Sequence, residues 1–206
     1  MSAVKGAPGS TKMNDGKTLY NIIYADPPWY YYGSPHKDQA AGKHYNLLKT
    51  EEIANLDVPS IIDGKAVLLL WSTSSKIKDA IYVMEAWGFH YRGVHHVWVK
   101  TRKDGTPISG QGIRPSFIKP TAEYLLIGST TKRGRTLPIC SESLPNVVLA
   151  PRPNRHSEKP DVFRELIDRL FCDRSLKRIE LFARKKVPGW DVWGDEVESD
   201  VEIVWR

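Results

Sequence analysis

Short apolar runs alternate along this chain with segments of helical periodicity. The runs at residues 20–25 (YNIIYA) and 66–71 (AVLLLW) are typical of buried strands, and the run at 122–129 (AEYLLIGS) predicts a third. Two amphipathic segments, which start near residues 74 and 160, are separated by such runs. Strands that alternate with helices predict an α/β fold, in which helices cover both faces of a sheet.

The ends of the predicted helices follow from residue types that favour helix termini. Thr50 is expected to cap a short helix, and Ser74 with Ser75 is expected to cap a second helix that runs to Trp87. Pro160 is expected to be the first residue of the last helix.

Further strands are predicted at residues 91–100, 146–150 and 178–183. His95 and His96 are adjacent in the first of these, so we expect them to face opposite sides of the sheet. Two histidines placed in this way do not easily share a metal ion, and no spacing of Cys, Asp or Glu completes a site. The sequence therefore predicts no metal.

Length, cysteine content and the lengths of the apolar runs indicate the number of domains and the cellular compartment. The 206 residues fit one domain, expected at residues 18–206, after a flexible polar tail at residues 1–17. Cys140 and Cys172 give no disulfide framework, and there is no apolar run of membrane-spanning length. We therefore expect a cytoplasmic protein in a reducing compartment, without a membrane partner.

Positive charge gathers in three places. The net charge of +6 favours a polyanionic partner such as nucleic acid, although many soluble proteins are equally basic. The clusters are Lys100, Arg102 and Lys103; Lys132, Arg133 and Arg135; and Arg152, Arg155 and Lys159. The cation-bearing segment at residues 101–120 is a candidate nucleic-acid-facing loop, and a merely solvated loop is the competing interpretation.

The segment Asp26-Pro27-Pro28-Trp29 follows the first predicted strand. Each proline fixes its own φ and lacks an N–H, and a residue before proline is pushed to an extended conformation. We therefore expect a stiff hook whose carbonyls are not consumed by local N–H groups. It lies at the carboxyl end of a strand, where open α/β sheets bind ligands. The competing interpretation is a turn that closes the strand, with Trp29 packed in the core.

The hook offers two hydrogen-bond acceptors, the Asp26 carboxylate and the Pro27 carbonyl, which suit the two hydrogens of an exocyclic amino group. A flat ring on that amine would stack on Trp29 or on a neighbour such as Tyr30, as a nucleobase flipped out of its stack does. The amine of adenine is a poor nucleophile because its lone pair is delocalised into the ring. Acceptors that draw it toward tetrahedral geometry localise that lone pair for attack on an electrophilic methyl group.

The segment Ala25-Asp26-Pro27-Pro28-Trp29 resembles the catalytic motif of amino-group methyltransferases that act on adenine. It is similar in particular to the family of the messenger-RNA adenosine methyltransferases and many bacterial and phage adenine-N(6) enzymes. The resemblance covers residues 20–196 and implies catalytic roles for Asp26, Pro27, Pro28 and Trp29. It also implies a Rossmann-like fold with a mixed, mostly parallel sheet, S-adenosylmethionine as methyl donor, and a catalytic segment that precedes the donor-binding segment.

A second block resembles the donor-binding part of the same family. It comprises residues 156–160 (HSEKP), a helix, residues 179–184 (IELFAR) and the later segments 189–190 (GW) and 194–196 (GDE). By this resemblance the donor contacts are Asp26, Ser157, Lys159, Glu180, Arg184, Lys186, Asp195 and Glu196. Asp195 stands where the family often has Asn. Lys185 or Lys186 stands where His or Asn is frequent, and either is a candidate for the donor carboxylate. For Glu180, a strand carboxylate paired with Arg184 is the competing interpretation.

Substrate contacts are expected from Trp29, Tyr30, Tyr45 and Arg114. Tyr45 belongs to a polar stretch beside the hook, and Arg114 belongs to the cation-bearing loop. For Tyr45, a side chain that only anchors its loop is the competing interpretation.

These features predict an S-adenosylmethionine-dependent methyltransferase for the 6-amino group of adenine in nucleic acid. Compactness and likeness to bacterial and phage members favour DNA over RNA, in a restriction-modification or phage setting. The lack of a G-x-G-x-x-G turn argues against a nicotinamide enzyme.

Competing functions are an RNA adenosine methyltransferase, a cytosine-amine methyltransferase, an inactive nucleic-acid-binding subunit of a methyltransferase pair, and a plain basic binding protein. Cytosine enzymes more often carry Ser in place of Asp26. Target choice would come from loops, a second copy of the chain or a partner subunit.

Overall fold

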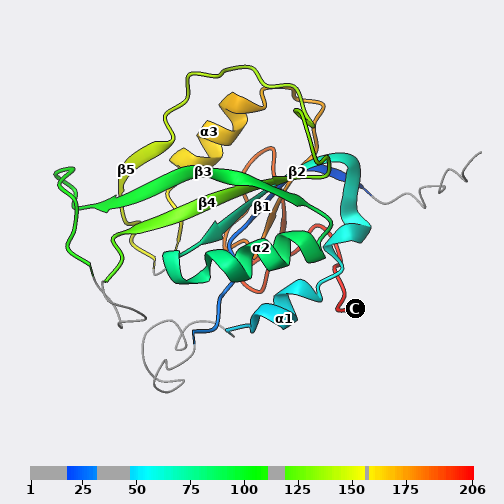
Figure 1. Ribbon diagram of the computed structural model, residues 1–206, viewed down its shortest axis with the longest axis horizontal. Helices are drawn as coiled ribbons and strands as arrows, with labels where there is room; N and C mark the ends of the chain where they lie inside the picture. Colours follow the sequence, from blue (N-terminus) through cyan, green and yellow to red (C-terminus); the bar gives the residue numbers. More distant parts are fainter. Residues whose placement is uncertain (1–17, 32–46, 111–118, 156–157) are drawn as a thin grey trace, which may run out of the picture.

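The computed structural model describes residues 18–31, 47–110, 119–155 and 158–206 (Figure 1). At its centre is a seven-stranded sheet with the strand order β5-β3-β4-β2-β1-β6-β7. The strands are β1 (Tyr20–Ala25), β2 (Ile62–Ser72), β3 (His90–Thr101), β4 (Ala122–Ser129), β5 (Val147–Pro151), β6 (Arg178–Leu181) and β7 (Asp191–Trp193). β4 is antiparallel to both of its neighbours, β3 and β2, whereas all the remaining pairs of neighbouring strands are parallel. The predicted mixed, mostly parallel sheet is confirmed.

Helices cover both faces of the sheet, as predicted. They are α1 (Thr50–Ala54), α2 (Ile77–Ala86) and α3 (Val162–Leu170), with short 3₁₀ turns η2 (Val58–Ile61) and η3 (Ser74–Lys76). α1 and α2 lie on one face and α3 on the other (Figure 1). Successive residues of a strand point to opposite faces, so Ile23 packs in the layer of α1 and α2, while Ile22 packs in the layer of α3.

Several predicted ends are shifted by a few residues. Lys49, not Thr50, is the N-cap of α1, and the Thr50 hydroxyl donates instead to Asp79 at 2.6 Å. Ser74 and Ser75 form the 3₁₀ turn before α2 and do not cap it. α3 begins at Val162 with Asp161 as its N-cap, so Pro160 precedes the helix, and its carbonyl accepts a hydrogen bond from the Phe163 N–H at 3.2 Å.

His95 and His96 do not face opposite sides of the sheet. The register of β3 against β4 shifts between Val94 and His96, and such a bulge turns a side chain that would otherwise alternate. The two Nδ1 atoms lie 2.5 Å apart, and the His96 ring packs edge-on against Phe163 beneath α3. Burial lowers the pKa of each imidazole to about 4, and for His95 the neighbouring His96 contributes to that shift.

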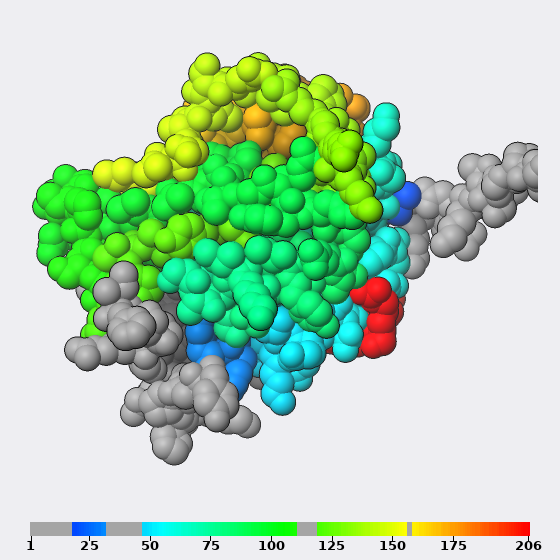
Figure 2. All heavy atoms as spheres, viewed as in Figure 1, coloured from blue at the N-terminus to red at the C-terminus, as the bar shows by residue number. Residues whose placement is uncertain are grey.

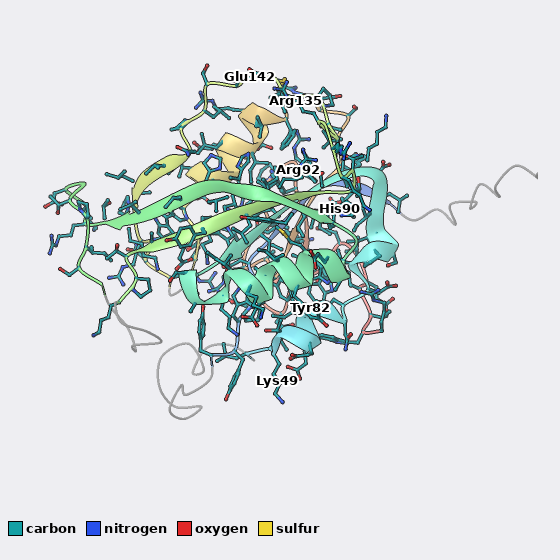
Figure 3. All side chains as sticks on the ribbon, in the orientation of Figure 1. Lys49, Tyr82, His90, Arg92, Arg135 and Glu142 are labelled. Atoms are coloured by element: carbon teal, nitrogen blue, oxygen red, sulfur yellow. A yellow bond between two sulfur atoms is a disulfide. The ribbon has the colours of Figure 1, made fainter. Side chains whose placement is uncertain are left out.

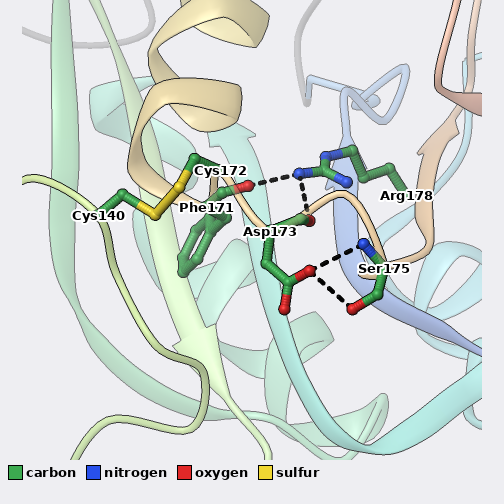
Figure 4. The surroundings of a disulfide bond; sticks show 6 residues. All are labelled: Cys140, Phe171, Cys172, Asp173, Ser175 and Arg178. Atoms are coloured by element: carbon green, nitrogen blue, oxygen red, sulfur yellow. Dashed lines mark hydrogen bonds between the residues drawn. A yellow bond between two sulfur atoms is a disulfide. The ribbon is translucent and has the colours of Figure 1, made fainter.

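The two cysteines are joined, contrary to the sequence-based expectation. Cys140 and Cys172 form a disulfide that ties the β4–β5 connection to the end of α3 (Figure 4). The Cys140 N–H also donates to the Leu170 carbonyl at 2.8 Å. The number and spacing of the cysteines did not predict this bond, because they are 32 residues apart in the sequence and only the fold brings their Cα atoms to 6.0 Å.

Within residues 18–31, 47–110, 119–155 and 158–206, no helix has the length and apolar character needed to cross a membrane. The same residues contain no group of three or more His, Cys, Asp or Glu side chains arranged to hold a metal ion. The expected N-terminal tail, residues 1–17, lies outside the described part of the chain.

Candidate active site

The carboxyl ends of β1, β2 and β6 meet at one edge of the sheet, and antiparallel β4 begins at that edge. A cavity lies there, at the position where open α/β sheets bind ligands. Its lining is Asp26, Pro27, Pro28, Trp29, Tyr31, Leu47, Trp71, Ser72, Thr73, Glu123, Lys159 and Arg184. The whole predicted hook therefore lines one cavity, together with Lys159 and Arg184 from the predicted donor-binding block.

The carbonyls of the hook accept local hydrogen bonds, which corrects the expectation that they are unused. The Trp29 N–H donates to the Pro27 carbonyl at 2.9 Å, and the Leu48 N–H donates to the Pro28 carbonyl at 2.9 Å. These bonds fix the hook against the chain that leads into α1. A carbonyl oxygen has two lone pairs, so the Pro27 carbonyl still has capacity for a second donor.

Trp29 is both a core residue and a lining residue. Its side chain is 6% exposed, and its Nε1–H donates to the Trp71 carbonyl at 3.1 Å. The competing interpretation of a packed Trp29 thus holds alongside the predicted place at the cavity. Tyr30 is 40% exposed and is not a lining residue, whereas Tyr31 is, and its hydroxyl lies 3.0 Å from the Thr73 hydroxyl.

Four charges of alternating sign run through the site. Lys159 Nζ lies 2.6 Å from Asp26 Oδ2 and 3.3 Å from Glu123 Oε2. Glu123 Oε1 in turn lies 2.5 Å from Lys100 Nζ. Burial outweighs Lys159 and raises the pKa of Asp26. Burial also acts to raise the pKa of Glu123, but its two lysines outweigh burial and hold that pKa below its usual value.

Glu180 pairs with Arg164, not with Arg184. Arg164 Nε lies 2.8 Å from Glu180 Oε2, and both residues are buried. Arg164 also contacts Asp161 at 2.9 Å and lies over the Tyr24 ring. The competing interpretation of Glu180 was therefore right about an ion pair but wrong about the partner. Glu180 itself is not among the residues that line the cavity.

The segment after β6 brings Arg184 to the cavity. Phe182 has a φ of +60°, an uncommon value for a residue with a side chain, in the turn directly after the strand. Arg184 Nε lies 3.9 Å from Glu196 Oε1, and Glu196 also contacts Arg155 at 2.9 Å.

Among the residues that the structure describes, the other predicted site residues do not line the cavity. Lys186 contacts Asp200 at 2.8 Å, and Lys185 contacts Glu158 and Asp161 at 3.0 and 2.9 Å. Asp195 and Glu196 lie on the turn after β7, outside the lining. Tyr45, Arg114 and Ser157 lie outside the described residues.

Sequence reasoning missed the other lining residues, which are Tyr31, Leu47, Trp71, Ser72, Thr73 and Glu123. Ser72 and Thr73 follow a long apolar run, so their position at a strand end was a usable signal. Glu123 gave no signal. Its place at the site depends on the antiparallel direction of β4, which the sequence does not specify.

Comparison with known proteins matches residues 20–196 to the MT-A70 family. The chain belongs to the MT-A70 family. The matched range equals the range of the sequence resemblance, so that prediction is confirmed. The matched range contains the hook and also Lys159 and Arg184, which line the same cavity.

Several proteins of similar sequence are named as methyltransferases. The type II methyltransferase M.MunI of Mycoplasma sp is 31% identical over 202 residues, which cover 89% of this chain and 81% of M.MunI. The N(6)-adenine-specific methyltransferase METTL4 of Mus musculus is 26% identical over 90% of this chain and 39% of METTL4. The N6-methyladenosine RNA methyltransferase MTA1 of Pyricularia oryzae is 27% identical over 86% of this chain and 47% of MTA1. The chain thus spans less than half of METTL4 and MTA1. The predicted adenine-N(6) methyltransferase is confirmed at the level of the family.

Proposed function

We propose that this protein transfers a methyl group from S-adenosylmethionine to the 6-amino group of adenine in DNA. The observation that carries the proposal is the meeting of Asp26, Pro27, Lys159 and Arg184 in one cavity. Two acceptors for an amine lie there beside two cations that suit the carboxylate of a methyl donor.

The lining also offers what a bound nucleobase and donor need. Walls from Pro28, Trp29 and Tyr31 are flat or apolar and suit a planar ring. Lys159 Nζ and the Arg184 guanidinium are donors for a carboxylate. S-adenosylmethionine supplies, when bound, a methyl group made electrophilic by a sulfonium.

In the proposed mechanism, the two amine hydrogens of a flipped adenine are donated to the Asp26 carboxylate and the Pro27 carbonyl. The nitrogen lone pair then points at the methyl carbon. The N–C bond forms as the C–S bond breaks, and the bond electrons pass to sulfur. The amine becomes acidic only once methylated, so Asp26 orients and need not be a strong base, and the proton leaves afterwards to solvent. Orientation supplies most of the rate.

DNA is preferred over RNA on two grounds. The ending AR…GW…WG is similar to bacterial and phage members of the family. The chain also covers most of M.MunI, a type II methyltransferase, but less than half of MTA1, an RNA methyltransferase. A restriction-modification role and a second copy or partner subunit that selects the target belong to the same proposal.

The test is transfer of labelled methyl groups to duplex DNA, single-stranded DNA and RNA, each with and without adenine. We expect label only in adenine-containing DNA, and a loss of at least a hundredfold for Asp26→Ala. Asp63→Ala is the matched control, since Asp63 lies at the start of β2, at the opposite edge of the sheet. Label confined to RNA would change the substrate, and near wild-type activity of Asp26→Ala would overturn the mechanism.

A further inference from the structure

The sheet separates the three basic clusters of the sequence. β3 and β5 are parallel and pair Thr101 with Pro151, so the segments that follow both strands leave at the same edge as the cavity. β4 runs the other way, so the segment after Ser129 leaves at the opposite edge. The cluster at residues 100–103 and the cluster that begins at Arg152 therefore come to the side of the cavity. The cluster at residues 132–135 lies at the opposite edge.

The figures show this separation. The turn after β3 projects at the left end of the molecule in Figures 1 and 2. Arg135 and Arg92 are placed toward the other end of β3 in Figure 3, and Arg92 donates to the Thr131 carbonyl at 3.2 Å.

The turn at residues 102–107 is internally bonded. The Arg102 N–H donates to the Thr106 carbonyl at 2.8 Å, and the Gly105 N–H donates to the Arg102 carbonyl at 3.0 Å. Gly105 has a φ of +84°, which favours glycine in such a turn. A bridge between Thr101 and Pro107 closes it. The turn therefore presents Arg102 and Lys103, both exposed, from a pre-formed backbone.

Asp104, the acidic residue of the turn, is hydrogen-bonded within the turn. The Asp104 carboxylate accepts the Thr106 N–H at 2.9 Å and the Thr106 hydroxyl at 2.7 Å. Two exposed cations and one locally bonded carboxylate leave the turn with a net positive charge, which suits a phosphate-bearing partner.

The turn is tied directly to the active site. The Lys100 carbonyl accepts the Ile108 N–H at 3.0 Å, so the base of the turn is bonded to Lys100. The side chain of the same Lys100 contacts Glu123, and Glu123 contacts Lys159, which holds Asp26. A nucleic-acid strand whose adenine enters the cavity would therefore run its sugar-phosphate backbone along the edge of the sheet from which this turn projects.

We propose that Arg102 and Lys103 contact phosphates of the nucleic acid beside the target adenine, so that this turn positions the strand for the cavity. The proposal rests on the proposed function and adds to it the surface that holds the backbone. Phosphate contacts fix register and orientation without reading sequence. The cluster of Lys132 and Arg133, at the opposite edge, takes no part.

The experiment is a salt titration of DNA binding by fluorescence anisotropy, with a labelled mixed-sequence duplex. The variant Arg102→Gln/Lys103→Gln is compared with Lys132→Gln/Arg133→Gln. Both variants remove one Arg and one Lys from exposed adjacent positions, so their net charges are equal. The first variant is expected to flatten the plot of log K against log salt by about 2, because each lost phosphate contact contributes about 0.9 to the slope. The second is expected to keep the wild-type slope.

Equal slopes for the two variants, or a wild type with no affinity for DNA at low salt, would overturn the proposed surface. Binding of S-adenosylhomocysteine, measured by calorimetry, separates this failure from a failure of the proposed function. It reports on the cavity alone and is expected to be unchanged in both variants. A wild type that binds DNA with the expected slopes but binds no S-adenosylhomocysteine would reject the function and keep the surface.

Discussion

Lys159 joins the two halves of the active site at the scale of single residues. It comes from the segment before α3, yet its Nζ contacts Asp26 at the end of β1 and Glu123 at the start of β4. Burial acts against its charge, but the two carboxylates outweigh burial and raise the pKa of Lys159. Lys159 is therefore held as a cation beside the hook, at the place where the proposed function puts the carboxylate of the methyl donor.

Glu123 should stabilise the fold in a pH-dependent way. Its pKa is lowered from 4.5 in the folded protein, so its stabilising effect is present above pH 4.5 and is lost as pH falls through the lower folded value. We expect Glu123→Gln to lower the free energy of unfolding by about 2 kcal/mol at pH 7. The deficit should shrink below pH 4.5, as measured by urea unfolding at pH 7 and pH 3.5.

Glu142→Gln is the control for that comparison, because Glu142 pairs with Arg135 in an exposed ion pair whose side chains are 64 and 69% exposed. It should cost well under 1 kcal/mol at either pH. A Glu123→Gln deficit of equal size at both pH values would contradict a role for the ionised carboxylate.

At the scale of elements, close backbone packing between the ends of β6 and β7 positions the segment that carries Arg184. The Ala183 N–H, just past the end of β6, donates to the carbonyl of Trp193, the last residue of β7, at 3.0 Å. A Cβ at Gly194 would lie 2.5 Å from the Ala183 carbonyl oxygen and 2.8 Å from the Ala183 nitrogen. Glycine at this position lets the two strand ends approach, and it thereby sets the path of the chain into Arg184.

Gly194→Ala should therefore destabilise the protein by about 2 kcal/mol, because the added methyl group meets backbone that cannot swing aside. Gly64→Ala in β2 is the control, since a Cβ there meets no atom within 4 Å. Chemical denaturation of both variants measures the difference. Equal stabilities would show that the strand ends relax at little cost.

The bulge in β3 should make the protein sensitive to acid. The pKa of His95 and His96 falls from 6.5 to about 4 on folding. Between these values the unfolded chain binds more protons, so stability falls as pH falls from 6.5 toward 4, by up to about 1.4 kcal/mol per pH unit for each histidine. His95→Gln should lose less stability over this window, as measured by thermal unfolding at pH 7 and pH 5. An unchanged pH dependence would place the acid-sensitive groups elsewhere.

The Cys140–Cys172 disulfide acts at the scale of the whole molecule. It fastens the long connection between β4 and β5 onto the end of α3 (Figure 4). The segment that it closes runs from residue 141 to residue 171 and contains Lys159, but neither cysteine is among the residues that line the cavity. The bond is therefore expected to stabilise the fold without taking part in catalysis.

Removing the bond by Cys140→Ser/Cys172→Ser should cost about 3–4 kcal/mol, because the cysteines are 32 residues apart and their link restricts the unfolded chain. The melting temperature of the wild type should fall on addition of a reductant, and that of the double variant should not change. Two titratable thiols in the unreduced wild type would show that the bond does not form.

The sequence alone determined the features that depend on near neighbours. Apolar runs predicted β1 and β4 with their observed bounds, because strands buried on both faces need little beyond local apolarity. The hook followed from proline stereochemistry, and the family resemblance followed from two motif blocks in order. Asp26, Pro27, Pro28, Trp29, Lys159 and Arg184 were predicted in this way and do line the cavity.

The tertiary structure decided what depends on strand direction and long-range pairing. The antiparallel course of β4 brought Glu123 to the site and sent Lys132 and Arg133 away from it. Packing of α3 against the sheet places buried Arg164 beside Glu180, so these two residues form the ion pair. The register shift in β3 places His95 and His96 in contact. These outcomes arise from contacts between residues far apart along the chain, whose geometry no local pattern encodes.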